Sequence, residues 1–128
     1  YGFIGRSRYL PDRRDLNRHF PGNPNGSAAS RIAWSLFDGI IRHCDGLVDV
    51  HTGSLNRTNL PQLRADLRDA KVREFVQGFG GMLVLHNPGR PGTLRYAAAR
   101  AGIPAPYHET LYRLVKAHES SWQRRPAH

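Results

Sequence analysis

The feature that most constrains the fold is an apolar run that ends in a histidine and a turn glycine, Leu47-Val48-Asp49-Val50-His51-Thr52-Gly53. A short apolar run bounded by a turn signal is typical of a buried β-strand. The run therefore predicts that the imidazole of His51 lies at the carboxyl end of a strand. In open α/β sheets, binding and catalytic groups gather in the crevice outside these strand ends.

The segments around this run predict an α/β fold, because helical and strand patterns alternate with short links. Ser27 is a predicted N-cap for a helix that reaches about Arg42. Residues 5–26 and 52–68 are polar and are predicted to be two long loops. The apolar face of the first helix consists of Ala29, Ile32, Ala33, Leu36, Phe37, Ile40 and Cys44.

Two further helices and a second strand follow. Asp69 and Thr93 are predicted helix caps, and residues 82–86 form a second apolar run that predicts a buried strand. Two prolines in residues 103–106 should break the strand expected there. The last predicted helix covers residues 107–122, because an apolar stripe with helical spacing runs along it, made of Leu111, Leu114, Val115, His118 and Trp122.

Length, charge and cysteine content limit the function classes. The 128 residues suit one domain, and the formal net charge is +9. The arginines are scattered and the chain has two lysines, so the charge does not favour a nucleic-acid partner. A single cysteine, Cys44, excludes an intrachain disulfide and a cysteine-rich zinc site.

The sequence contains no apolar stretch of transmembrane length and no signal-peptide pattern. We therefore expect a cytoplasmic protein that does not enter the membrane. The chain begins Tyr1-Gly2-Phe3 without an initiator Met, which favours a piece of a longer gene product. The pattern leaves the oligomeric state open.

His51 has two interpretations. A neutral imidazole at a strand end suits a zinc ligand, and Asp49, two residues earlier on the same face of the strand, could orient it. Alternatively, His51 bonds a backbone carbonyl and closes the strand. A catalytic zinc needs three protein ligands, so His51 alone does not make such a site.

Arg8, Asn17 and Arg18 form a second candidate group, in the first loop. The arginine fork matches a carboxylate, and an asparagine amide adds an orienting donor or acceptor. This combination suits an anionic group on a small-molecule substrate. The alternative is that these are solvated arginines of a basic protein.

These motifs, in this order, resemble the succinylglutamate desuccinylase/aspartoacylase family of zinc-dependent deacylases, which are similar to zinc carboxypeptidases. The first matching block runs from Gly5 to Gly22 and contains Arg8-Tyr9 and Asp15-Leu16-Asn17-Arg18. The second runs from Val48 to Ser54 and continues with Arg57 to Arg64. The third joins Pro91-Gly92-Thr93-Leu94-Arg95 to Ala97-Ala98-Ala99-Arg100-Ala101-Gly102-Ile103-Pro104.

The resemblance implies a three-layer α/β sandwich around a mixed sheet, here incomplete. It implies that His51 is the third zinc ligand and that Arg8, Asn17 and Arg18 hold the carboxylate of the substrate. In such enzymes zinc polarises the scissile amide and activates a water, and a glutamate moves the proton.

The chain also departs from the family pattern. The first two zinc ligands would lie upstream of Tyr1, and the catalytic glutamate is expected on the strand after Gly102-Ile103-Pro104. Residues 105–122 instead resemble the last helix of ketopantoate reductases. We therefore divide the chain into a partial deacylase-like domain, 1–104, and a C-terminal helix and tail, 105–128. We expect Glu109 not to replace the glutamate.

Two functions remain open at this point. One is a fragment of a zinc-dependent amide hydrolase for N-acyl amino acids or similar small acids, inactive as this chain alone. The other is a non-catalytic carboxylate-binding fragment or a nonfunctional chimeric product.

Overall fold

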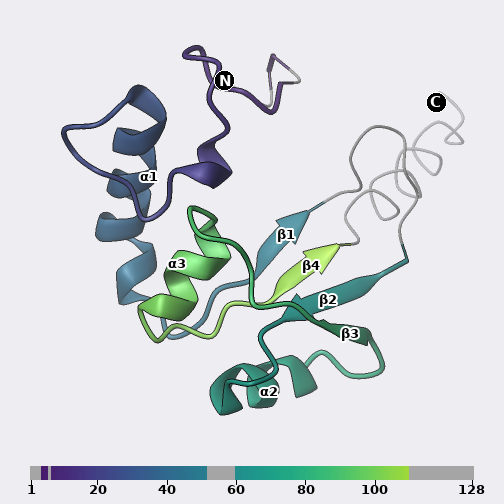
Figure 1. The fold of residues 1–128 in the computed structure, drawn as a ribbon. Helices are drawn as coiled ribbons and strands as arrows, with labels where there is room; N and C mark the ends of the chain where they lie inside the picture. The colour runs from purple at the N-terminus through teal and green to yellow at the C-terminus, as the bar shows by residue number, and fades with distance from the viewer. Residues whose placement is uncertain (1–3, 6, 52–59, 110–128) are drawn as a thin grey trace, which may run out of the picture.

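The computed structural model describes residues 4–5, 7–51 and 60–109, which form helices around a four-stranded sheet (Figure 1). The helical elements are η1 (Leu16–Arg18), α1 (Ala28–Gly39), η2 (Ile41–His43), α2 (Ala70–Gln77) and α3 (Leu94–Arg100). The strands are β1 (Asp49–His51), β2 (Gln62–Ala65), β3 (Leu83–His86) and β4 (Tyr107–Glu109).

The sheet is open and mixed, in the order β1-β4-β2-β3. β1 runs parallel to β4, β2 runs parallel to β3, and β2 and β4 are antiparallel. The last described strand, β4, therefore lies inside the sheet, and β1 and β3 form the edges of the described sheet. The predicted α/β class with a mixed sheet is confirmed.

The helices begin where the sequence predicts, because local side chains bind their free N–H groups. The Ser27 hydroxyl accepts from the N–H of Ser30, and the Asp69 carboxylate accepts from the second and third N–H groups of α2. Thr93 caps α3 in the same way. The first helix ends at Gly39, and η2 replaces the turn predicted to reach Arg42.

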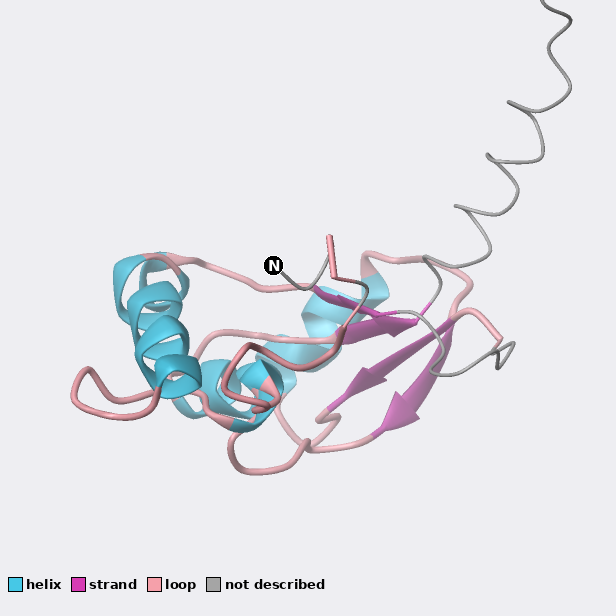
Figure 2. Cartoon of the chain, turned by 90° about the horizontal axis from the view of Figure 1, so that it is seen from above, coloured by secondary structure: helices cyan, strands magenta, loops and turns pink. Residues whose placement is uncertain are grey.

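Two hydrophobic clusters hold the layers together. α3 lies between α1 and the sheet (Figure 1), and the first cluster joins these two helices through Ala33, Phe37, Ala97 and Ala98. The second packs α2 against one face of β2 and consists of Leu63, Ala65, Val72 and Val76. Seen from above, α1 lies far from the strands, at the other end of the molecule (Figure 2).

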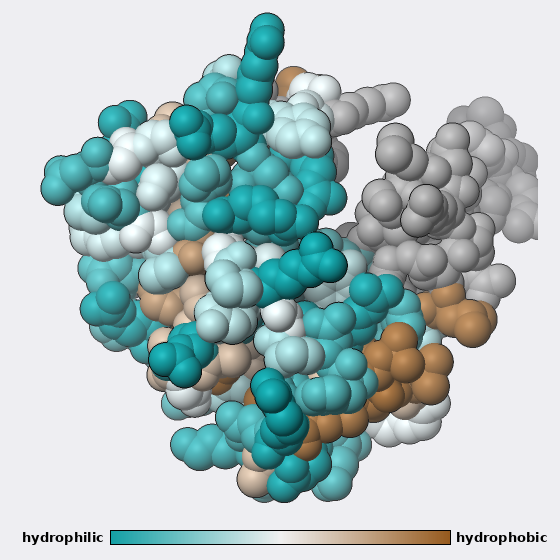
Figure 3. All heavy atoms as spheres, viewed as in Figure 1, coloured by the Kyte–Doolittle hydropathy of each residue, from teal (hydrophilic) through white to brown (hydrophobic). Residues whose placement is uncertain are grey.

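Three predictions about apolar residues are wrong. Residues 62–65 were predicted as loop but form β2, in which Leu63 and Ala65 are fully buried. The predicted second buried strand is an edge strand with exposed leucines, Leu83 and Leu85, and the corresponding region of Figure 3 shows a hydrophobic patch. On α1 and at its C-cap, the outer members of the predicted apolar face are exposed, namely Ile32, Leu36 and Ile40.

The predicted helix over residues 107–122 is wrong at its start. Residues 107–109 form β4, paired on both sides. The backbone of residues 104–106 already pairs with the segment before β1, since Leu47 and Asp49 donate to the carbonyls of Pro104 and Pro106. The remainder of the predicted helix lies outside the described residues. Within the described ranges, no helix is long and apolar enough to cross a membrane.

Candidate functional site

The sheet has two chemically different faces. Strand register places Val50, His108, Leu63 and Val84 side by side on the face that carries α2. The opposite face carries polar side chains, among them Asp49, Tyr107 and Arg64. The candidate site lies on this second face.

A pocket of about 270 Å³ opens there, between the sheet, the first loop and the start of α3. The five residues predicted from the sequence all line it, although they come from β1 and from the loop around η1. The full lining is Arg8, Asn17, Arg18, Asp49, His51, Arg64, Asn87, Gly89, Arg90, Thr93, Arg95 and Tyr107.

His51 is held against the sheet on two sides. Its ring stacks on that of Tyr107, with centroids 4.2 Å apart. Its Nε2 atom lies 2.9 Å from Oδ1 of Asp49, as the shared strand face predicts. This approach lacks hydrogen-bond geometry, so the buried Nε2 has no hydrogen-bond partner among the described residues. A buried nitrogen without a partner is unfavourable unless something else binds it.

Arg8 is positioned by Asp15. Its Nε donates to Oδ2 of Asp15 at 2.9 Å, and its Nη2 forms an ion pair with the same oxygen at 2.8 Å. The other oxygen of Asp15 accepts from the N–H of Asn17 and caps η1. One acidic side chain therefore fixes Arg8 and begins the turn that carries Asn17 and Arg18.

Asn17 ties the first loop to α3. Its Oδ1 accepts from the N–H of Leu94 at 2.8 Å, across 77 residues of sequence. This bond satisfies a free donor at the start of α3. The side-chain NH2 group donates to no other described residue. It is therefore available to a ligand in the pocket.

Arg18 lies beside Asn17 with half of its side chain exposed. It donates to the carbonyl of Asn17 and lies 3.9 Å from Asp15. Its remaining N–H groups make no further bond to a described residue. Arg18 can therefore donate to an anion without first breaking a short ion pair.

Three of the pocket residues that were missed from the sequence lie together: Arg64, Arg95 and Tyr107. The guanidinium groups of Arg64 and Arg95 lie 5.5 and 5.9 Å from the centre of the Tyr107 ring. Alternation of polar and apolar residues over 62–65 could have revealed Arg64. For Tyr107, the proline-broken segment before it gave no signal.

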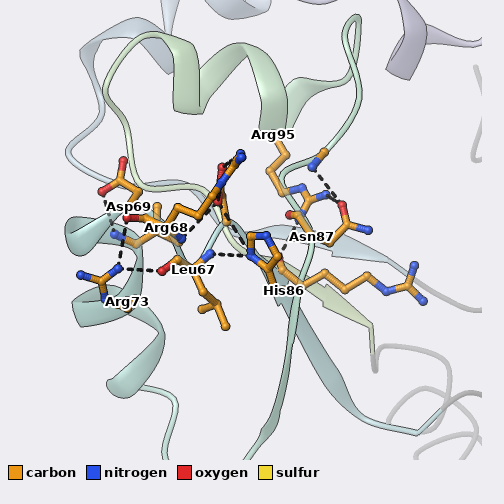
Figure 4. Close-up of polar contacts among 11 residues, drawn as sticks. Leu67, Arg68, Asp69, Arg73, His86, Asn87 and Arg95 are labelled. Atoms are coloured by element: carbon orange, nitrogen blue, oxygen red, sulfur yellow. Dashed lines mark hydrogen bonds and ion pairs between the residues drawn. The ribbon is translucent and has the colours of Figure 1, made fainter.

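Arg95 connects β2 to the segment after β3 at one side of the pocket. It donates to the carbonyl of Arg64 at 2.9 Å, and also to the carbonyl and the Oδ1 of Asn87 at 2.9 and 2.8 Å. Figure 4 shows the side chains of Arg95 and Asn87 facing each other. Burial lowers the pKa of Arg95 from its ordinary value, but arginine stays charged at neutral pH.

The pocket is strongly cationic. Five arginines line it, and Asp49 is the one carboxylate among the lining residues. Low-dielectric walls with one sign of charge concentrate the field and attract ions of opposite sign. The arrangement therefore suits a small anion.

A separate polar network fixes the carboxyl ends of β2 and β3 (Figure 4). Asp66 pairs with Arg68 at 2.7 Å, and this contact lowers the pKa of Asp66 to about 2. His86 Nδ1 accepts from the N–H of Leu67 at 3.1 Å. These side chains do not line the pocket, so their role in the described structure is to hold the strand ends.

Glu109 lies at the end of β4, where its backbone is the register partner of His51. Glu109 was expected to leave the sheet as part of a helix, and this expectation is wrong. No group of three His, Cys, Asp or Glu side chains in the described ranges is arranged to hold a metal ion.

Known proteins share this fold. The family model described as the succinylglutamate desuccinylase/aspartoacylase catalytic domain matches residues 1–110. No curated protein matches the chain.

Solved structures match as well. A succinylglutamate desuccinylase/aspartoacylase from Rhodobacter sphaeroides is 27% identical with a TM-score of 0.71, over 84% of this chain and 33% of that one. The product-bound ectoine utilization protein EutE from Ruegeria pomeroyi is 26% identical with a TM-score of 0.72, over 84% and 35%. An aspartoacylase family protein from Mesorhizobium loti, 23% identical over 84% and 37%, shares the fold with a TM-score of 0.70. The chain therefore spans about a third of the length of these structures.

Proposed function

The chain belongs to the succinylglutamate desuccinylase/aspartoacylase family, and from this premise we propose that it is the substrate-binding part of a zinc-dependent amide hydrolase. Its substrates are N-acyl amino acids or similar small acids. By itself, the chain binds the carboxylate and does not hydrolyse the amide.

One observation carries the proposal. Arg8, Asn17 and Arg18 line the same pocket as His51, although more than thirty positions separate them in sequence. Arginines scattered at random over a basic surface would not be expected to gather in one pocket around a half-buried imidazole. The convergence favours a carboxylate site next to a reacting group.

Each residue has a role that follows from its contacts. Arg18 forms the charge-assisted bonds to the carboxylate, because its guanidinium is half exposed and makes one hydrogen bond to a described residue, to the carbonyl of Asn17. Asn17 orients the same carboxylate through its NH2 group, while its oxygen holds α3 in place. Arg8, fixed by Asp15, contributes charge from the other side of the loop.

His51 is the proposed zinc ligand of this chain. Its buried Nε2, without a hydrogen-bond partner among the described residues, suits such a role. Asp49 Oδ1 lies 2.9 Å from this same nitrogen, so Asp49 would lie beside the metal and would not orient the ring through the other nitrogen. A catalytic zinc needs three protein ligands, and the described ranges do not bring three together. They do not fit a complete zinc site, so this chain's own contribution is to bind and orient the substrate.

Glu109 is the acidic residue of β4. The resemblance expects the catalytic glutamate on the strand after Gly102-Ile103-Pro104, and β4 is the next strand. β4 is thus the strand on which the resemblance expects a glutamate, but Glu109 itself is not assigned the proton-transfer role.

The experiment compares two ligands of similar size, one anionic and one neutral. We expect isothermal titration calorimetry to detect binding of succinate to the chain and a much weaker response to succinamide, because the pocket is lined by five arginines. The succinate affinity should fall as salt is added. Equal affinities for the two compounds would contradict a carboxylate site.

A further inference from the structure

The segment that leads into α3 lies directly against the loop that carries Asn17 and Arg18. The carbonyl of Gly92 accepts from the N–H of Phe20 at 2.9 Å. Two residues later, the N–H of Leu94 donates to Oδ1 of Asn17 at 2.8 Å. Because Asn17 and Phe20 flank Arg18 in the sequence, the two bonds hold the loop on both sides of this arginine.

Gly92 has no room for a side chain. Its φ is +84°, a left-handed conformation that favours glycine. A Cβ atom at this position would lie 2.6 Å from the carbonyl oxygen of Arg18 and 3.1 Å from its carbonyl carbon. These are backbone atoms, so a change of rotamer cannot remove the clash. The close approach of the two segments at Arg18 therefore requires glycine at position 92.

The start of α3 also joins this contact to the sheet. Leu94 is the first residue of the helix and donates its N–H to the first loop. The next side chain, that of Arg95, donates to the carbonyl of Arg64 on β2 and to Asn87 after β3, as Figure 4 shows for Asn87. Two consecutive residues therefore connect the first loop to the sheet that carries His51.

We propose that Gly92 and Leu94 are positioning residues of the carboxylate site, which place Arg18 and Asn17 beside the pocket. This inference rests on the function proposed above. Neither Gly92 nor Leu94 lines the pocket, so both act through the loop and not on the ligand. The amide of Asn17 is planar, so the bond from Leu94 to its oxygen also fixes the direction of its NH2 group.

Gly102, at the other end of α3, has the same backbone conformation without the contact. Its φ is +80°, and a Cβ there would meet no described atom within 4 Å outside its two chain neighbours. It does not line the pocket. Gly92→Ala and Gly102→Ala should therefore introduce similar backbone strain, whereas Gly92→Ala alone should displace Arg18.

The affinity for succinate, measured by isothermal titration calorimetry, separates these two variants. We expect Gly92→Ala to bind succinate about fivefold or more weakly than the parent chain, which corresponds to the loss of about one hydrogen bond. Gly102→Ala should bind as the parent chain does, although urea unfolding should show a similar loss of stability in both variants. Equal affinities of the two variants would overturn the role of Gly92.

A second pair of variants tests Leu94. Proline is favoured at the first position of a helix, and the extended φ and ψ of Thr93, −84° and 150°, suit a residue before proline. Leu94→Pro removes the N–H, and its ring takes the place of the hydrogen, so the Asn17 side chain has to turn away. Leu94→Ala also shortens the side chain but keeps the N–H.

We expect Leu94→Pro to bind succinate about fivefold more weakly than Leu94→Ala, because the Asn17 amide loses its fixed direction. The same affinity in both variants would refute the role of Leu94. This comparison stands even if Gly92→Ala does not fold.

Hydrogen exchange tests the position of the loop without a ligand. The N–H of Phe20 is bonded to the carbonyl of Gly92, so it should exchange about fivefold faster in Gly92→Ala than in Gly102→Ala. A parent chain that does not bind succinate would contradict the proposed function, and the exchange rates would then decide on the positioning alone. Equal exchange of Phe20 in the two variants would contradict the positioning, whatever the affinities.

Discussion

The rings of His51 and Tyr107 stack with centroids 4.2 Å apart and an angle of 26° between their planes. The contact crosses from β1 to β4, two strands that are 56 positions apart in sequence and neighbours in the sheet. It turns the imidazole edge toward Asp49 and the pocket. The position of the proposed ligand therefore depends on a strand that no local pattern predicted.

This stacking gives the first prediction. Tyr107→Leu should remove the ring current that acts on His51, so its Hε1 proton resonance should move toward the value of a free histidine. Tyr107→Phe keeps an aromatic ring and should leave the resonance near its original position. Ring stacking contributes about 0.5–1.5 kcal/mol, so only Tyr107→Leu should loosen the imidazole. Identical spectra for the two variants would refute the contact.

The second prediction separates two roles of Asn17. Asn17→Ala leaves the N–H of Leu94 without its partner, which should lower the free energy of unfolding by about 1–3 kcal/mol. Asn17→Asp keeps the acceptor oxygen but loses the NH2 donor and adds a negative charge. It should therefore keep most of the stability in urea unfolding but lose succinate binding. Unchanged binding in Asn17→Asp would show that the amide donor does not contact the ligand.

The third prediction concerns acid stability. The ion pair with Arg68 lowers the pKa of Asp66 from 3.8 to about 2 in the folded chain. Asp66 therefore stabilises the fold above pH 4, and this contribution is lost as the pH falls from about 4 through about 2. Asp66→Asn should show a weaker dependence of the unfolding free energy on pH in this window. Parallel curves for the variant and the parent chain would contradict the assignment.

The fourth prediction concerns zinc. One proposed ligand is present where three are needed, so the chain alone should bind zinc weakly at neutral pH and should not hydrolyse N-acyl amino acids. His51→Ala should reduce the weak binding further in a calorimetric titration. Submicromolar binding lost in His51→Ala, or zinc-dependent turnover lost in Glu109→Gln, would show that the chain supplies a complete site.

Local chemistry explains why much of this could be predicted from the sequence. Ser27, Asp69 and Thr93 cap helices through bonds to residues two or three positions away, so a short window contains the whole signal. The same holds for the run that ends at His51. The resemblance grouped Arg8, Asn17 and Arg18 with His51, and these residues do line one pocket.

The rest depends on distant contacts. β2 is four residues long and contains Gln62 and Arg64, so its composition looks like loop until β3 and β4 pair with it. Leu83 and Leu85 have the apolar character of a buried strand, but nothing covers β3 at the edge of the described sheet. The apolar stripe after residue 110 has helical spacing, so the predicted helix was extended back to Tyr107. Tyr107 instead lies in a strand, because β1 and β2 pair with it.

The most direct test of the account is the affinity of succinate for Arg18→Ala compared with Arg42→Ala. Arg42 is an equally exposed arginine that pairs with Asp38 at 2.9 Å and does not line the pocket. A charge-assisted bidentate bond is worth about 1.5–3 kcal/mol, which corresponds to a loss of about tenfold or more in affinity. The account predicts this loss in Arg18→Ala and no change in Arg42→Ala. Equal affinities of the two variants would show that Arg18 is a solvated surface residue, and would contradict the carboxylate site.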